Sequence, residues 1–189
     1  MAQEDAVGTG RFDLIRVWDP FVRIFHWGLA TSFLVVFLTR HGAGSLHYWA
    51  GGAAAALVLL RLLWGLLGTH YARFSQFVRG PRAVGGYLWA IATGREARYI
   101  GHNPAGGVMI IALMLIMLAT AATGYLQTTD QFFGDEGMQR LHHVLGNGLL
   151  LLVLAHLAGV ALASLRHREN LVAAMVSGRK RSPAPEDVA

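Results

Sequence analysis

The sequence predicts an all-α integral membrane protein, a bundle of four transmembrane helices with a short amphipathic helix on the membrane surface. Of its 189 residues, 54% are hydrophobic and only 14% are charged, far less charge than a soluble domain carries. The apolar residues fall into four runs, residues 21–39, 47–67, 107–126 and 142–165. Each run approaches or exceeds the roughly 20 residues that a helix needs to cross a bilayer core of about 30 Å. Because backbone groups in lipid must pair within their own segment, each run is predicted to be a helix.

The basic residues predict the orientation of these helices. Three arginines lie at or before the start of the first helix, five lie between the second and third, and five basic residues follow the fourth. The other two connections hold one arginine each, Arg40 and Arg140, and three acidic residues accompany Arg140. Positive charge marks the cytoplasmic side, so both termini are expected there. The net charge of +5 therefore reflects topology, and no nucleic-acid partner is expected.

The segments outside the four runs divide the chain into three parts. Residues 1–20 form a cytoplasmic N-terminal segment, residues 21–166 the membrane domain, and residues 167–189 a cytoplasmic tail whose Pro-containing end is expected to be disordered. The long connection between the second and third runs contains "FSQFVRGPRAVGGYLWAIATG", which alternates apolar and basic positions and predicts the surface helix. The five tryptophans are expected mainly as anchors at the membrane interface.

Histidines in the apolar runs are the candidate functional residues, because ionisable groups at membrane depth usually mark a functional site. A helix turns about 100° per residue, so His142 and His156, 14 positions apart, project from nearly the same face and lie about 21 Å apart along the axis. His143 diverges from His156 by roughly 140° and is expected to point elsewhere. Cysteine is absent, which excludes thiolate metal sites and covalent c-type haem attachment.

The predicted topology sorts the histidines into two pairs at two depths. His26 lies at the cytoplasmic end of the first helix and can face His156, while His47 begins the second helix on the outer side and can face His142. Imidazoles from different helices, one on each side of an iron atom, are what two six-coordinate b-type haems require. We therefore expect His26 and His156 to bind the inner haem iron, and His47 and His142 to bind the outer one.

Other residues on these faces suit the same cofactors. A porphyrin needs a helix surface without bulk, and small residues follow three of the four histidines by about one turn: Gly51, Gly146 and Gly159. Glycine is also common in ordinary packing of membrane helices. Arg61 follows His47 by 14 positions, at the cytoplasmic level, where an unpaired charge costs at least ~2.5 kcal/mol. Its partner is either a propionate of the inner haem or the lipid headgroups.

Several stretches together resemble one known family: "VWDPFVRIFHW", "LHYWAGGAAAALVLLRLLWG", "GHNPAGG" and "LHHVLGNGLLLLVLAHLAGV". The chain resembles the bacterial cytochrome b561 family and its relatives, the b-type cytochrome subunits of nickel–iron hydrogenases and thiosulfate reductases. The likeness covers nearly the whole chain after residue 11. It implies a bacterial inner-membrane protein with two non-covalent haems b, whose ligand positions fall on His26, His47, His142 and His156.

The expected function is electron transfer between ubiquinone or menaquinone and a redox partner, either a periplasmic cytochrome c or a catalytic subunit; a homodimer is compatible with the sequence. Iron held by histidine on both sides has no open position, so no catalytic residue is assigned. Quinol oxidation releases protons, and His143, His102, Asp19 and Arg61 are unranked candidates to handle them. Otherwise His102 either has a turn or interface role or contacts a haem propionate or the quinol.

Two other functions rank lower. A superoxide:quinone oxidoreductase acting at the outer haem would need a basic funnel on the outer face, where only Arg40 and Arg140 are available. A metal transporter would use the same histidines, but the spanning segments lack the carboxylates that most cation pathways use.

Overall fold

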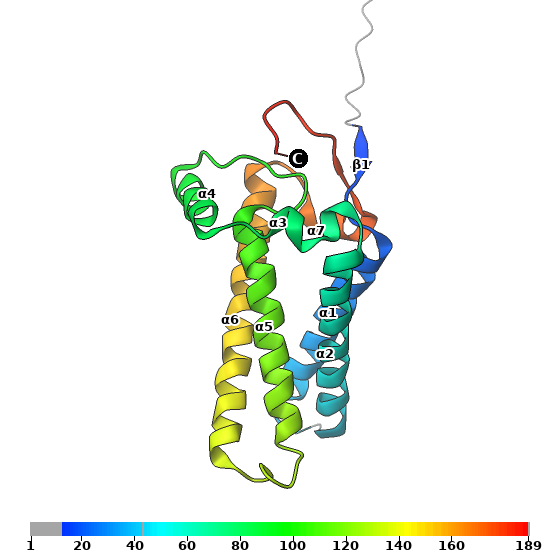
Figure 1. The fold of residues 1–189 in the computed structure, drawn as a ribbon, viewed down its shortest axis with the longest axis vertical. Coiled ribbons are helices and arrows are strands. Elements are labelled where there is room, and N and C mark those ends of the chain that lie inside the picture. The colour runs from blue at the N-terminus through cyan, green and yellow to red at the C-terminus, as the bar shows by residue number, and fades with distance from the viewer. Residues whose placement is uncertain (1–12, 43, 189) are drawn as a thin grey trace, which may run out of the picture.

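The computed structural model describes residues 13–42 and 44–188, which form a helical bundle with a small cap at one end (Figure 1). The elements in chain order are β1 (Leu14–Arg16), α1 (Pro20–Thr39), α2 (Gly44–Leu67), the 3-10 helix η1 (His70–Ala72), α3 (Phe74–Phe77), α4 (Pro81–Thr93), α5 (Pro104–Leu126), α6 (Glu136–Arg166), α7 (Leu171–Ser177) and β2 (Arg179–Arg181). Residues 1–12 of the predicted N-terminal segment lie outside the described residues.

Four of these helices, α1, α2, α5 and α6, are long and apolar enough to cross a membrane. Helix α2 packs against α1 and α5, and α5 packs against α6, around a core that includes Val58, Met114 and Leu149. Within the most apolar stretch of each helix, between 6% and 22% of the residues are buried. An apolar surface this extensive requires lipid around it. The predicted fold class, a four-helix membrane bundle, is confirmed.

The helices begin earlier than the apolar runs because polar residues cap them. The side chains of Asp19, Asn103 and Asp135 accept hydrogen bonds from backbone N–H groups three residues later, which starts α1, α5 and α6. Pro20 and Pro104 occupy the first turn of α1 and α5, where a missing N–H is harmless. Helix α6 consequently starts six residues before the predicted run, since hydropathy marks only its lipid-facing part.

The cap gathers η1, α3, α4, α7 and the two strands at one end of the bundle, and both described chain ends lie there (Figure 1). The single surface helix predicted between the second and third runs is two helices, α3 and α4. The break occurs at Val78–Gly80, where Val78 and Gly80 have extended backbones and Pro81 starts a new helix.

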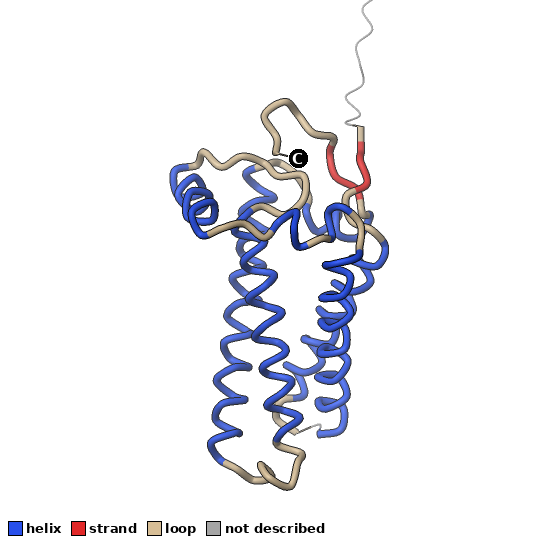
Figure 2. The backbone as a smooth tube through the Cα atoms, in the orientation of Figure 1, coloured by secondary structure: helices blue, strands red, loops and turns tan. Residues whose placement is uncertain are grey.

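The prediction of a disordered tail is wrong. β2 pairs antiparallel with β1, with Leu14 opposite Arg181 (Figure 2). Further on, the Ile100 N–H donates to the Val188 carbonyl at 2.9 Å, and the Val188 N–H donates to the Arg98 carbonyl at 2.9 Å. Backbone pairing with distant segments therefore orders a stretch whose composition predicts disorder.

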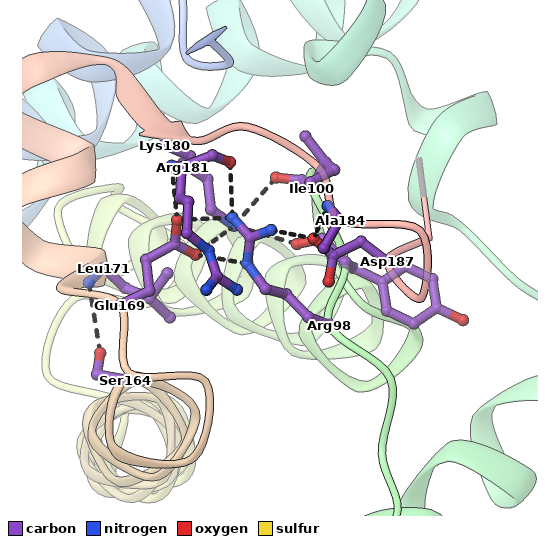
Figure 3. A network of polar contacts seen from close by, with 10 residues as sticks. Arg98, Ile100, Ser164, Glu169, Leu171, Lys180, Arg181, Ala184 and Asp187 are labelled. Atoms are coloured by element: carbon purple, nitrogen blue, oxygen red, sulfur yellow. Dashed lines mark hydrogen bonds and ion pairs between the residues drawn. The ribbon is translucent and has the colours of Figure 1, made fainter. Parts of the chain in front are cut away.

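Buried ion pairs join the same distant segments (Figure 3). The Arg98 side chain, 5% exposed, pairs with Glu169 at 2.8 Å and with Asp187. The Lys180 ammonium lies 3.3 Å from Glu169 and donates to the Tyr99 and Ile100 carbonyls at 3.1 and 3.0 Å. Buried charges persist only where partners satisfy them, and here the partners come from four parts of the chain. The network holds the tail on the connection that leads into α5.

Candidate functional site

His47 and His142 meet at the end of the bundle opposite the cap. Their ring centroids lie 6.3 Å apart, with His47 in the first turn of α2 and His142 in the second turn of α6. The His47 Nδ1 donates to the Val36 carbonyl at 3.0 Å, and the His142 Nδ1 donates to the Thr120 carbonyl at 3.0 Å. A ring that donates through Nδ1 leaves the lone pair of Nε2 available for a metal.

The separation of these two rings suits one metal atom between them. With metal–nitrogen bonds of about 2 Å, two ligating imidazoles have centroids roughly 6 Å apart, close to the observed 6.3 Å. The backbone carbonyls that fix each Nδ1 are the outer partners that metal-binding histidines usually have. The structure thus brings together the two histidines predicted for the outer haem, and their role as iron ligands stays a prediction.

Helix α5 supplies three residues that position His142 and that sequence reasoning missed. The Thr123 hydroxyl lies 3.0 Å from the His142 Nδ1, and Thr120 provides the carbonyl that accepts from it. A Cβ on Gly124 would lie 3.1 Å from the His142 Cε1, so the ring fits because residue 124 is glycine. Two threonines and a glycine at positions i, i+3 and i+4 share a helix face, which is the only signal the sequence offers.

The second predicted pair, His26 and His156, lies in the half of the bundle nearer the cap. His26 is two turns into α1, and His156 is three turns from the end of α6. The His26 Nδ1 is buried and has no hydrogen-bond partner among the described residues. The two imidazoles are close enough to interact electrostatically. A buried nitrogen without a partner is costly, and a bound group could supply the contact that the protein does not.

Arg61 is buried under the cap rather than extended to lipid headgroups. Arg61 is only 2% exposed. Its Nη2 donates to the Ala72 carbonyl at 2.8 Å, and its Cζ lies 5.3 Å from the Phe74 ring centroid. Contact with headgroups, one of the two expectations from sequence, is therefore wrong. The Nη1 is buried without a partner among the described residues, so an acceptor is lacking on that side. Contact with a haem propionate stays a prediction.

Asp19 connects α1 to the cap. It accepts hydrogen bonds from the Thr69 hydroxyl at 2.6 Å, the Val22 N–H at 2.8 Å and the Trp64 indole at 3.1 Å. Burial opposes ionisation, but these bonds outweigh it and hold the pKa of the Asp19 carboxyl below its ordinary value. Trp18 is 6% exposed and packs inside the protein, so the expectation that it anchors at the interface is wrong. Trp64 is half-buried and donates its indole N–H to Asp19, and its interface role stays a prediction.

His102 lies beside the same region, just before the α5 cap residue Asn103. Its ring packs against Trp18 and Phe77, with centroid distances of 4.6 and 4.7 Å. Its Nδ1 is buried and has no partner among the described residues. Burial, together with the positive charges of Arg61 and Lys180, lowers the pKa of His102 to about 3, so the ring is neutral at physiological pH.

The three glycines predicted to border a porphyrin all face open space. A Cβ on Gly51, Gly146 or Gly159 would meet no atom within 4 Å. Gly51 and Gly146 are half-buried while Gly159 is exposed, so the first two are the stronger candidates to border a bound group. His143 is exposed, with its ring centroid 6.3 Å from that of His142, and it takes no part in the His47 contact.

A membrane bundle with an inward-facing pair of imidazoles and open space beside neighbouring glycines defines a class, the transmembrane b-type cytochromes. Comparison with known proteins identifies the family. The family model described as prokaryotic cytochrome b561 matches residues 17–178, and the chain belongs to this family.

Curated relatives at low identity extend over almost the whole chain. Each of three is a probable Ni/Fe-hydrogenase B-type cytochrome subunit. The protein from Bradyrhizobium diazoefficiens is 23% identical over 94% of this chain and 89% of its own length. The protein from Rhizobium leguminosarum bv. viciae is 24% identical over 92% of this chain and 91% of its own length. The protein from Cupriavidus necator is 24% identical over 93% of this chain and 91% of its own length. No solved structure matches the chain significantly.

The chain is therefore a multi-pass membrane cytochrome of the b type, and its function is electron transport. The resemblance to this family seen in the sequence is confirmed. The cofactor that the class implies is haem b, which supplies a one-electron redox couple when bound. The residues present fit such a group: imidazoles with fixed tautomers, open space beside Gly51 and Gly146, and a buried Arg61 nitrogen that lacks an acceptor.

Proposed function

We propose that this cytochrome binds two haems b and carries electrons across the bacterial inner membrane between the quinone pool and a redox partner. In this proposal His47 and His142 hold the haem at the outer end, and His26 and His156 hold the one near the cap. Arg61 binds a propionate of the cap-end haem. The ligands of the two proposed sites come from α1, α2 and α6 at different depths, so electrons that enter at one membrane surface can leave at the other.

One observation supports this proposal above all, the contact between His47 and His142. Two rings from different helices approach to 6.3 Å although each is tethered through Nδ1 to a backbone carbonyl of another helix. Two neutral imidazoles gain little from each other at this distance, and the Nδ1–H contacts leave the Nε2 lone pair of each ring to accept. A metal atom between them satisfies both nitrogens. An iron held by both imidazoles would have no open position for oxygen, so the site would favour outer-sphere electron transfer over oxygen chemistry.

The identity of the partners follows from the relatives and from the charge distribution. The relatives are named as hydrogenase cytochrome subunits, so a catalytic subunit of that kind is the first candidate to exchange electrons with this chain. A periplasmic cytochrome c is the second. Ubiquinone or menaquinone is the diffusible substrate. The cap carries most of the basic residues, which supports a cytoplasmic location for it and for both termini. A homodimer is not required.

Superoxide oxidation at the outer haem is the alternative function. It needs a cationic approach to the outer end, and of the two arginines there, Arg40 lies over the Phe37 ring with its Cζ 4.3 Å from the centroid. Quinone-dependent superoxide consumption by the purified protein, far above the rate of uncatalysed dismutation, would favour this alternative.

The test is a set of single substitutions in detergent-purified protein. Haem content comes from pyridine haemochrome, and midpoint potentials come from optical redox titration. We expect two haems per chain in the wild type. His47→Leu and His142→Leu should remove the same redox component, and His26→Leu and His156→Leu the other. His143→Leu is the matched control and should keep both.

Two results would refute the proposal. A haem stoichiometry near zero in protein produced with adequate haem supply would exclude both sites. Retention of both redox components after His47→Leu would exclude a haem between His47 and His142. Electron transfer between the two membrane surfaces through this chain would then lack its outer haem.

A further inference from the structure

We propose that His102 is a cofactor-binding residue, and that His102 and Arg61 together hold one carboxylate of the haem at the cap end. This inference rests on the proposed function, because it requires a haem between His26 and His156. It adds a residue from outside the membrane-spanning helices to the binding site, and it assigns a role to a histidine that the iron does not need.

The His102 ring is held in place by residues from distant parts of the chain. His102 reaches inward from the connection between α4 and α5 and packs between Trp18, which precedes α1, and Phe77 at the end of α3. Three separate segments of the chain therefore fix the imidazole. A histidine that served only to turn the chain would have no reason to be held in this way, and the turn itself is made by the Asn103 cap and Pro104.

His102 and Arg61 each have a buried nitrogen that lacks a hydrogen-bond partner among the described residues. These nitrogens are the His102 Nδ1 and the Arg61 Nη1. Both side chains contact the same aromatic ring: Phe77 lies 4.7 Å from the His102 ring centroid and 5.9 Å from the Arg61 Cζ. Two neighbouring groups that each lack a contact point to one missing acceptor.

The missing acceptor is expected to be an anion. Arg61 carries a positive charge, whereas His102 is neutral because burial and the nearby cations lower its pKa to about 3. Asp19 interacts electrostatically with Arg61, but its oxygens already accept from Thr69, Trp64 and Val22. An additional anion is therefore favoured, and a carboxylate can accept from a guanidinium and an imidazole N–H at once.

A small cavity beside His102 is compatible with this role. It has a volume of about 20 Å³, lies within the cap and is lined by His102 together with Tyr71, Tyr99 and Gln76. This volume holds roughly one water molecule, which can serve the second ring nitrogen. The imidazole can then present Nδ1–H to the interior without leaving Nε2 unsatisfied.

The experiment compares two substitutions at His102 with a matched control in the holoprotein. His102→Phe keeps an aromatic ring between Trp18 and Phe77 but removes both nitrogens, and His102→Asn keeps a polar group. His70→Phe is the control, because His70 is an exposed histidine of the same cap. The readouts are haem content and the midpoint potentials of the two haems at pH 8. The cap-end haem is identified as the redox component that disappears in His26→Leu.

We expect both His102 variants to keep two haems. His102→Phe should lower only the cap-end midpoint, and His102→Asn, which retains side-chain N–H donors, should lower the same midpoint by less. A carboxylate that loses a donor keeps more of its negative charge, which stabilises the oxidised iron. A charge-assisted hydrogen bond corresponds to a factor of roughly ten in the redox equilibrium, or about 59 mV for one electron. Arg61→Met should shift the same midpoint, and the double variant should shift it by less than the sum, since both residues bind one group.

A second measurement separates a haem carboxylate from a free anion. Protein loaded with haem carrying ¹³C in its propionate carboxyls is examined by redox-difference infrared spectroscopy. We expect the isotope-sensitive carboxylate band to move in His102→Asn and to stay in His70→Phe. A band that moves only with the anion in the buffer would identify a free anion and overturn the proposal.

The outcomes separate this inference from the function on which it rests. Unchanged midpoints and an unchanged labelled band in both His102 variants would overturn the inference while two haems per chain keep the proposed function intact. Loss of both haems from both variants would also count against it, because the His47–His142 site should survive. Absence of haem in the wild type would overturn the proposed function itself.

Discussion

Gly124→Ala is expected to weaken the outer haem although it improves the helix. Residue 124 lies in the last turn of α5, against the His142 ring. An added methyl group would sit 3.1 Å from the His142 Cε1 and 3.6 Å from its Nδ1. Ordinary carbon contacts begin near 3.5 Å, so the ring must move by a few tenths of an ångström. That movement lengthens the 3.0 Å bond from Nδ1 to the Thr120 carbonyl towards the limit of hydrogen bonding.

Two opposing effects set the size of the change. Replacing glycine by alanine inside a helix stabilises it by about 1 kcal/mol, which should raise the thermal stability of the apoprotein. Disturbing the outer partner of a metal-binding histidine typically lowers metal affinity 10- to 100-fold, or about 1.4–2.8 kcal/mol. Haem affinity should therefore fall while the helix is strengthened, a combination that general destabilisation does not produce.

The assay measures outer-haem content during titration of apoprotein with haem, with the outer component assigned by its loss in His47→Leu. Gly52→Ala is the matched control, because a Cβ on exposed Gly52 would meet no atom within 4 Å. It should gain the same helix stability and bind both haems normally. If Gly124→Ala binds the outer haem as tightly as Gly52→Ala does, then the approach of His142 to α5 does not position an iron ligand.

Two further predictions follow from the structure. Gly51→Leu should displace the outer haem by filling the open space beside His47, at an overpacking cost of about 1–3 kcal/mol. Gly52→Leu is the control and should leave the outer haem in place. Equal haem content in the two variants would exclude Gly51 from the site. The cap should loosen in acid. Burial raises the pKa of Glu169 and of Asp187, but other contacts outweigh it and leave both below their ordinary values of 4.5 and 3.8. These contacts are chiefly with Arg98 at Glu169, and with the Ala184 N–H and then Arg98 at Asp187. Their stabilisation is thus complete above about pH 4.5 and is lost as the pH falls through the lowered values. Hydrogen exchange of residues 98–100, corrected for intrinsic rate, should accelerate below about pH 4; protection that persists at pH 2 would contradict the role of these ion pairs.

The bundle could be predicted because its two signals are local. Long apolar runs predict helices in lipid wherever they occur, and the structure places a helix at each run. Histidine spacing along one helix likewise selects a face, and His142 rather than His143 does face His47. The helix starts were missed by up to six residues, since caps such as Asp135 depend on single polar side chains rather than on hydropathy.

The cap could not be predicted because its stability comes from pairs that are distant in sequence. Arg98 meets Asp187 across most of the C-terminal half of the chain, and neither position alone predicts the other. The composition of residues 182–188 favours disorder, and only the strand pairing and buried charges of the folded chain overcome that preference.

By itself, then, the sequence determined the number of spanning helices, their alternation and which histidines could share a face, because these depend on periodicity and on the cost of polar groups in lipid. Only the tertiary structure decided that Thr120, Thr123 and Gly124 orient His142, that Arg61 is turned inward, and that His102 lies beside it. Such contacts join residues from separate helices and loops, and packing alone brings those residues together.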